Sequence, residues 1–452
     1  MRPAEHPSPF PIERRHAAKL RRGLTRSSSL LLPVVITLVL LPAFRTSAEP
    51  NIPRKKTTIE FAIPERPPQT VPRSVLIRGL CGDIGQSCTW ERTLGGPGAD
   101  RAHALAPMAD DGMVVVGDTG WLSGPLSGWI VRLDRSGQPL WEKRVGGRDS
   151  DQIRAVVATP EGGVVAAGHS RSAGAGESDF WIVSLDSRGD VQWQRLYGGE
   201  ANDRARAIAI DSRNGDYLVG GFTRSKAEGD GDGWLIRLNP NGMMTWNATF
   251  GGPGEDAIYK IEAAADGWLL AGYKEFADER GYDLWVMKLD HGGRLIWERT
   301  FDRNSFDAAS SIRVAADGRI LVVGQTSRSM SDSDAWLLGL SSEGDLLWER
   351  SDGGSKIDVA LDVAIDAAGF WVVALATSSF GSGSQDTWVL GLNHEGTLIW
   401  ERIYGGAMWD SPAALELAAN GDLLIAGSTA VSALNREDFW LLRLNSRGDF
   451  YD

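Results

Sequence analysis

Short runs of alternating apolar and polar residues follow one another through most of the chain. Residues 256–262, 268–272, 284–289 and 295–301 are four such runs. An Asp-Gly turn separates the first run from the second, and a turn with Gly-Gly separates the third from the fourth. Alternation with a period of two predicts β-strands with one buried face, and Asp-Gly turns between such runs predict hairpins. This stretch is therefore predicted to form four short antiparallel strands.

The same pattern recurs along the chain, and tryptophan marks it. Two tryptophan series keep step with each other, and members of the first series are 51 to 53 residues apart. Self-similarity at a fixed period is typical of repeat architectures, and we predict seven units of about 52 residues from residue 90 onward. The first series is Trp90, Trp141, Trp193, Trp246, Trp297, Trp348 and Trp400, and the second is Trp129, Trp181, Trp234, Trp285, Trp336, Trp388 and Trp440.

Four-stranded units that repeat radially form β-propeller blades. The predicted fold class is all-β: a seven-bladed β-propeller of four-stranded blades. A fourth-strand sequence occurs at 89–93, before any first strand, and the last unit stops at 448–452, where its own fourth strand would begin. The N-terminal strand is therefore predicted to complete the last blade and to leave no sheet edge unpaired. Both tryptophan positions are predicted to lie in the core between blades.

The first 48 residues follow a different pattern. A basic stretch that ends at Arg26 precedes the apolar run at 30–44, and small residues follow at 46–48. This order predicts a secretory signal peptide over residues 1–48, with an uncleaved membrane anchor as the alternative. The proline-rich residues 49–75 predict an extended linker before a propeller at 76–452. The expected location is periplasmic or secreted.

Charge and cysteine content limit the classes of partner. The chain carries a net charge of −12, and residues 1–48 hold eight basic and two acidic residues, so the remainder carries −18. An acidic surface argues against nucleic acid and anionic membranes as partners. A protein or a glycan is the expected partner, with no membrane insertion after signal cleavage, and the chain is expected to be a monomer. Cys81 and Cys88 predict one disulfide in an exported protein.

The repeat motifs resemble those of a known group of proteins. Gly-Gly-x-x-x-Asp, an Asp/Asn-Gly turn and a third-strand Asp-x-Trp resemble the β-propeller repeats of exported bacterial surface proteins. Leu-Asp-x-x-Gly-x-x-x-Trp is similar to the tryptophan-docking turn of quinoprotein-like propellers, including the lipoprotein scaffold of outer-membrane assembly. The Asp-to-Gly spacing here is one residue shorter, and the anchoring cysteine of that lipoprotein is absent. The resemblance implies a fold, because propellers include enzymes, lectins and scaffolds.

A carboxylate recurs four residues after the second glycine position of each unit. An Asp at a strand entry accepts backbone N–H groups from a tight turn, and this structural role is the prediction. The alternative is a cation-binding rim, for which Ca²⁺ is the suitable ion. No other metal site and no cofactor are predicted. The seven carboxylates are Asp100, Asp151, Asp203, Asp256, Asp307, Asp358 and Asp410.

Positions where the repeat is broken are better candidates for function. Trp121, Arg171, Arg224, Arg328 and Trp409 fall in loops that are predicted to share one face, and none of them occupies a core repeat position. Trp121 and Trp409 are predicted to flank an aromatic groove. This face is therefore predicted to bind a protein partner or a glycan.

Catalysis has little support in the sequence. His103, His169, His291 and His394 share no repeat position, and no nucleophile elbow, zinc motif or phosphate-binding loop occurs. The main interpretation is a non-enzymatic extracytoplasmic binding or scaffold protein. The alternatives are a carbohydrate-binding propeller and a quinoprotein-like enzyme, for which no motif marks a pyrroloquinoline quinone pocket.

Overall fold

The computed structural model describes residues 73–81, 88–120, 124–276, 281–303, 306–432 and 436–451. The chain divides into two compact units, Met1–Thr57 and Thr58–Asp452, and every described residue belongs to the second unit. The predicted signal peptide, most of the predicted linker and Trp121 lie outside the described residues. Within the described ranges the regular elements are all strands, and no helix there is long and apolar enough to cross a membrane.

The strands pair antiparallel in chain order, in groups of four. The first group is β3 (Ala99–Pro107), β4 (Met113–Gly120), β5 (Ser127–Leu133) and β6 (Pro139–Val145). The following groups are β7 (Asp151–Ala158), β8 (Val164–Ser170), β9 (Asp179–Leu185) and β10 (Val191–Tyr197); β11 (Asp203–Ile210), β12 (Tyr217–Thr223), β13 (Asp232–Leu238) and β14 (Met244–Phe250); β15 (Asp256–Ala264), β16 (Gly267–Phe276), β17 (Gly281–Asp290) and β18 (Leu295–Phe301); β19 (Phe306–Val314), β20 (Ile320–Ser329), β21 (Asp332–Leu340) and β22 (Leu346–Asp352); and β23 (Asp358–Ile365), β24 (Trp371–Thr377), β25 (Asp386–Leu392) and β26 (Leu398–Tyr404).

Parallel contacts join consecutive groups at one edge. A single parallel pair, Tyr282 with Phe306, merges β15–β18 and β19–β22 into one eight-stranded sheet. Isolated parallel bridges occupy the same place between other groups, where a residue at the start of a third strand or just before it meets the residue before the next first strand. These bridges are Ser178–Asn202, Gly231–Glu255, Ser333–Ile357 and Gln385–Trp409.

The last sheet contains strands from both ends of the described chain. It has the order β1 (Arg73–Cys81), β2 (Cys88–Gly95), β29 (Arg436–Leu444), β28 (Leu423–Ser432) and β27 (Asp410–Leu417). β1 begins inside the segment predicted as linker and was not expected as a strand. Its apolar residues Val75 and Ile77 are 51% and 52% exposed, so they do not mark a buried face. A disulfide between Cys81 and Cys88 joins β1 to β2.

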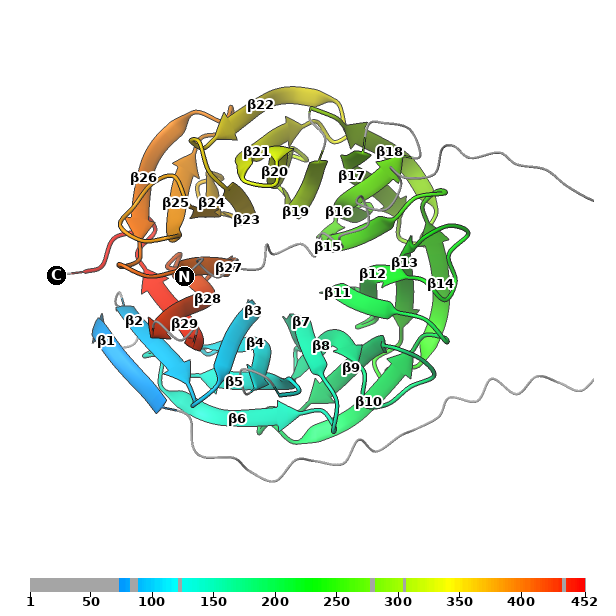
Figure 1. The fold of residues 1–452 in the computed structure, drawn as a ribbon, viewed down its shortest axis with the longest axis horizontal. Coiled ribbons are helices and arrows are strands. Elements are labelled where there is room, and N and C mark those ends of the chain that lie inside the picture. The colour runs from blue at the N-terminus through cyan, green and yellow to red at the C-terminus, as the bar shows by residue number, and fades with distance from the viewer. Residues whose placement is uncertain are drawn as a thin grey trace, which may run out of the picture. The chain divides into compact units, whose positions relative to one another are not determined.

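Figure 1 shows β3, β7, β11, β15, β19, β23 and β27 nearest to a common centre, with the fourth strands outermost. Four-stranded antiparallel sheets arranged radially and packed face to face are the architecture of a β-propeller. Hydrophobic clusters lie between consecutive groups, as where Ile130 of β5 packs with Val183 of β9. Another cluster joins the last sheet to the first group, where the rings of Trp129 and Phe439 lie 4.5 Å apart.

The third-strand tryptophans are buried and hydrogen-bonded. The Nε1 atom of Trp285 donates to Glu298 Oε1 of the neighbouring fourth strand at 2.8 Å. Trp440 of β29 makes the equivalent bond at 2.9 Å to Glu91 Oε1, which lies on β2. β2 therefore stands in the same relation to β29 as each fourth strand to its third strand. The other such pairs are Trp129–Glu142, Trp181–Gln194, Trp234–Asn247, Trp336–Glu349 and Trp388–Glu401.

The fourth-strand tryptophans pack on the turn glycine of the next group. A β carbon on Gly344 would lie 3.0 Å from the Trp297 ring, and one on Gly137 would lie 2.9 Å from the Trp90 ring. Both glycines have φ near +80°, in the left-handed region that glycine adopts without strain. Trp90 is buried, whereas the other six fourth-strand tryptophans are half-buried. The expectation of a fully buried core therefore holds for the third-strand position and for Trp90.

Candidate functional site

The antiparallel order of the strands gives every group two different edges. The turns between first and second strands and between third and fourth strands lie at one edge, which we call the turn face. The loops between second and third strands, and the connections into the next first strand, lie at the other edge, which we call the loop face. Each repeated Asp begins or enters a first strand at the loop face.

The repeated carboxylates are engaged in hydrogen bonds within their own units. Asp151 accepts from Gly147 N at 2.6 Å, from Ser170 Oγ at 2.5 Å and from Ser172 Oγ at 2.6 Å. Within the described residues, no cluster of three or more His, Cys, Asp or Glu side chains is placed to hold a metal ion. The equivalent backbone bonds join Gly96 to Asp100, Gly199 to Asp203, Gly252 to Asp256, Arg303 to Asp307, Gly354 to Asp358 and Gly406 to Asp410.

The other residues singled out from the sequence lie at the loop face but on different units. Arg171 is exposed after β8, and Arg224 after β12 pairs with Glu255 at 2.8 Å. Arg328 in β20 pairs with Asp332 at 3.0 Å. Trp409 is half-buried just before β27. The structure therefore does not gather these four residues into one site.

The loop face also carries apolar side chains that the sequence did not reveal. Met330 is 80% exposed, Phe380 is 42% exposed and Val431 is 40% exposed. Together with Trp409 they form what we call the apolar loop surface. They fall in variable loops outside every repeat position, and the available signal was a large apolar residue inside a serine-rich loop, as at Met330 and Phe380.

Hydrogen bonds connect the loops that carry this surface. Ala430 N donates to Trp409 O at 2.7 Å, and Trp409 forms a β-bridge with Gln385 of the loop that contains Phe380. Lys356 N donates to Ser379 Oγ at 3.2 Å, beside Phe380. The apolar side chains thus project from loops that support one another.

A cluster of basic side chains lies on the inner strands near the loop face. Its members are one or three residues after the repeated Asp of β3, β7 and β11: Arg101, His103, Arg154, Arg204 and Arg206, which we call the arginine sector. Arg154 Nη1 lies 3.1 Å from each nitrogen of the His103 ring. The guanidinium carbon of Arg206 lies 5.4 Å from the centre of the Tyr259 ring. None of these residues except His103 was a candidate from the sequence, although the basic residues follow the repeated Asp at the same spacing in each strand.

Two carboxylates serve one side of the arginine sector. Asp118 accepts from His103 Nε2 at 2.7 Å and from Gln152 Nε2 at 3.1 Å. Glu437 receives two hydrogen bonds from Arg101, one of them at 3.2 Å. Both of these acidic side chains therefore lie at the β3 end of the sector.

Burial and mutual repulsion change the protonation of the sector. Burial, with added repulsion from neighbouring arginines, lowers the pKa of Arg154 to about 10 although Asp118 opposes the change. Burial and the charges of Arg154, Arg204 and Arg206 hold the pKa of His169 well below its usual value. Burial and Arg154 also lower the pKa of His103. At neutral pH the imidazoles are therefore neutral and the arginines carry the positive charge.

The inner strands on the other side carry a charge network with matched signs. Lys260 Nζ of β15 lies 3.1 Å from Asp362 Oδ1 of β23, and Arg313 of β19 pairs with Glu262 at 3.1 Å and with Glu416 of β27. We call these five residues the paired network. Burial acts to raise the pKa of Asp362, but Lys260 and Arg313 hold it below its usual value. A pocket of about 240 Å³ is lined by Glu262, Arg313 and Glu416 among others.

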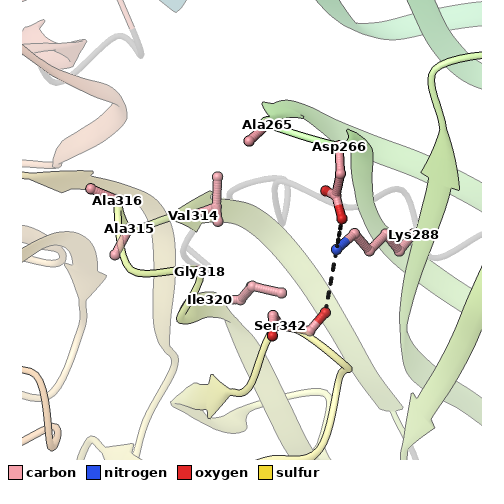
Figure 2. Close-up of a pocket in the computed structure, with 9 residues that line it drawn as sticks. All are labelled: Ala265, Asp266, Lys288, Val314, Ala315, Ala316, Gly318, Ile320 and Ser342. Atoms are coloured by element: carbon pink, nitrogen blue, oxygen red, sulfur yellow. Dashed lines mark hydrogen bonds and ion pairs between the residues drawn. The ribbon is translucent and has the colours of Figure 1, made fainter.

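A larger pocket of about 440 Å³ lies at the turn face. Figure 2 shows its lining, with Lys288 bound between Asp266 and Ser342. Lys288 Nζ lies 2.8 Å from Asp266 Oδ2, and this contact lowers the pKa of Asp266. The remaining lining is aliphatic, including Val314 and Ile320. Its one cation is already neutralised, so the pocket offers little polar chemistry to a ligand.

The fold and these surfaces define a β-propeller-type repeat protein. Comparison with known proteins adds little to this class. No family model matches the chain. It is 27% identical over 192 residues to the regulatory protein FlaEY of Caulobacter vibrioides, a match that covers 39% of this chain and 18% of that protein.

Solved structures similar to the chain are known at low identity. The WD40 domain of Neurospora crassa Pan2 has a TM-score of 0.49 at 10% identity, covering 79% of this chain and 92% of that domain. Sqt1 of Chaetomium thermophilum has a TM-score of 0.45 at 17% identity, covering 73% and 80%. Puromycin hydrolase has a TM-score of 0.49 at 13% identity, covering 78% of this chain and 54% of the enzyme.

Proposed function

We propose that the chain is an exported, non-enzymatic binding or scaffold protein that takes a protein partner on its loop face. The observation that carries this proposal is the apolar loop surface of Met330, Phe380, Trp409 and Val431, whose loops are joined by hydrogen bonds. Large apolar side chains that are exposed on one face of a folded protein are typical of interaction sites. An apolar segment of a protein is the partner that such a surface suits.

The proposed architecture is a seven-bladed propeller in which β2 completes the last blade. The pairing of β2 with β29 supports it, and so does the bond from Trp440 to Glu91. Arg443 of β29 supports it further, because this fully buried side chain pairs with Asp111 in the turn after β3 at 2.8 Å. Such closure would hold the loops at fixed positions, as a scaffold requires.

The proposed location is the periplasm or the cell exterior, after removal of the leader. The Cys81–Cys88 disulfide supports an oxidising compartment. The similarity to the regulatory protein FlaEY agrees with a binding role, although the chain spans only 18% of the length of that protein. We propose that the exported chain acts as a monomer, without nucleic acid and without insertion into a membrane.

Site-specific photo-crosslinking tests the partner surface. A photoreactive amino acid placed at Met330 or Phe380 is expected to trap a discrete protein partner in cell envelopes. The matched controls are Ile296 and Leu347, which are 52% and 55% exposed on outer strands. Equal crosslinking at all four positions, or no adduct at Met330 and Phe380, would contradict the proposal.

Carbohydrate binding is the second candidate function. Trp409, on a segment bridged to the loop of the exposed Phe380, offers an aromatic surface of the kind on which sugars stack. Binding on a glycan array that Trp409→Ala abolishes would favour this function over a protein scaffold. Calcium belongs in the same assay, because a cation rim at the repeated carboxylates predicts binding that a chelator removes.

A further inference from the structure

The arginine sector places like charges together where the other inner strands do not. The positions one and three residues after each repeated Asp hold Arg, His or Gln in β3, β7 and β11. In the other four inner strands the same positions hold no basic residue. In β15, β19, β23 and β27 these positions hold Ala257, Tyr259, Ala308, Ser310, Val359, Leu361, Ser411 and Ala413. Positive charge at these two positions is therefore confined to three consecutive units.

The acidic side chains that the structure describes nearby are already engaged with Arg101, His103 and Gln152. Glu437 is bound to Arg101, and Asp118 accepts hydrogen bonds from His103 and Gln152. Among the described residues no carboxylate forms an ion pair with Arg154 or Arg206. Arg154 bonds instead to the neutral groups of His103 and Gln152, with Nη2 donating to Gln152 Oε1 at 2.7 Å.

Three polar atoms in the sector or beside it also lack a hydrogen-bond partner among the described residues. The Nε atoms of Arg154 and Arg206 and the Nδ1 atom of His169 are shielded from solvent and lack a hydrogen-bond partner in the described part of the chain. Buried polar groups are normally satisfied in folded proteins, and an exception calls for a ligand or another explanation. The guanidinium group presents its donors in a planar fork that matches carboxylate and phosphate oxygens.

We propose that Arg154 and Arg206, assisted by Arg204, bind a small ligand that carries phosphate or carboxylate oxygens. The side chains are half-buried on neighbouring inner strands, and two guanidinium groups suit a small molecule with two or more oxyanion groups. Binding would neutralise the repulsion that lowers the pKa of Arg154 and would supply acceptors for the unpaired donors. This proposal does not rest on the partner surface of the loop face.

A purely structural role would have a different form in this fold. The paired network shows how the same inner strands hold arginine for stability, since Arg313 there has two carboxylate partners. Arg206 instead faces an aromatic ring, and Arg154 faces an imidazole whose pKa is lowered. Arg154 and Arg206, which have no carboxylate partner among the described residues, are suited to an anion that comes from outside the chain.

Calorimetric titration of the full-length protein tests the site. Pyrophosphate and citrate are titrated separately in chloride buffer, with ionic strength held constant so that screening does not imitate binding. At least one anion is expected to bind saturably, and the one that binds more tightly identifies phosphate or carboxylate as the ligand group. Arg154→Gln and Arg206→Gln are each expected to weaken that binding about tenfold, the size of one lost charge-assisted contact.

Arg294→Gln is the matched control, because Arg294 is 89% exposed and far from the inner strands in its turn. This variant is expected to bind like the wild type. The melting temperature in chloride buffer provides the second measurement: Arg206→Gln is expected to melt no lower than wild type, since it removes repulsion. The proposal fails if neither anion binds saturably, if Arg206→Gln binds as tightly as wild type, or if Arg206→Gln lowers the melting temperature without ligand.

Discussion

The arginine sector and the paired network lie on the same set of inner strands but treat charge in opposite ways. In the paired network, Lys260 and Arg313 each meet carboxylates within 3.1 Å, on strands that are not neighbours in the sheet. In the arginine sector, Glu437 binds Arg101 and Asp118 binds His103, and no described carboxylate pairs with Arg154 or Arg206. Within the described residues, every cation of the paired network therefore has a carboxylate partner, whereas Arg154 and Arg206 have none.

This difference distinguishes charged residues that stabilise a repeat fold from charged residues that are available to bind a ligand. A buried ion pair costs free energy when either partner is removed, because the remaining charge keeps its desolvation penalty without compensation. An unmatched cation has the reverse effect, since its removal relieves repulsion in the empty protein. Substitutions in the two clusters should therefore change stability in opposite directions.

The largest effect is expected from Asp362→Ala in the paired network. Asp362 is buried, accepts from Ser311 Oγ at 2.6 Å and faces Lys260 and Arg313. Its loss leaves the half-buried Lys260 without its carboxylate and removes the acceptor of Ser311 Oγ and Leu415 N, so the free energy of unfolding should fall by about 3–5 kcal/mol. Urea denaturation measures this change.

The control for this substitution is Asp345→Ala, whose side chain is 73% exposed and should change stability by less than about 0.5 kcal/mol. If Asp362→Ala is as mild as this control, the paired network is not the stabilising member of the comparison.

A smaller effect of opposite sign is expected from Arg206→Gln in the arginine sector. Removing one of four clustered guanidinium groups should raise the free energy of unfolding by about 0.5 kcal/mol in chloride buffer. Repeating the urea titration with saturating pyrophosphate or citrate should reverse the order of wild type and variant, because the ligand stabilises the tighter-binding wild type by about 1.4 kcal/mol more for a tenfold difference in affinity. A variant that is less stable in both buffers would mean that the two clusters are alike.

Much of the fold could be predicted from the sequence because the same strand and turn residues recur in each unit. The tryptophan spacing and the Asp-Gly turns predict four-stranded antiparallel groups, and the structure shows such groups in a propeller arrangement. β1 escaped prediction, since it follows a proline-rich segment and exposes Val75 and Ile77. The half-burial of most fourth-strand tryptophans was also hidden, because it depends on how far each ring projects over the glycine of the next group.

The candidate sites were much harder to predict, because they depend on contacts between distant units. Arg313 and Glu416 are 103 residues apart, and Arg101 and Glu437 are 336 residues apart. These sequence separations do not indicate that the residues of either pair are in contact. Trp409 is a candidate because it breaks the repeat, and its role in binding stays a prediction. Arg154 and Arg206 do not break the repeat, because they occupy regular positions that hold uncharged residues in other units. Comparing residue type at equivalent positions around the repeat would have revealed the arginine sector.

The smallest effect is expected from a like-charge pair of the opposite sign, Asp438 with Asp100. Burial and the charge of Asp100 raise the pKa of Asp438 to about 6. An unfolded chain has a value near 3.9, so the folded state holds this proton more tightly. The stabilising contribution of Asp438 is therefore fully present below about pH 4 and is lost as pH rises through about 6.

Asp438→Asn removes this dependence, because the amide is neutral at every pH. The variant should melt higher than wild type at pH 7.5, by on the order of 1 °C, and the difference should vanish near pH 4.5. Comparing melting temperatures at the two pH values cancels effects that both proteins share, including protonation of Asp362. A difference that is the same at both pH values would show that Asp438 acts through packing, and like-charge repulsion would then belong to the arginine sector alone.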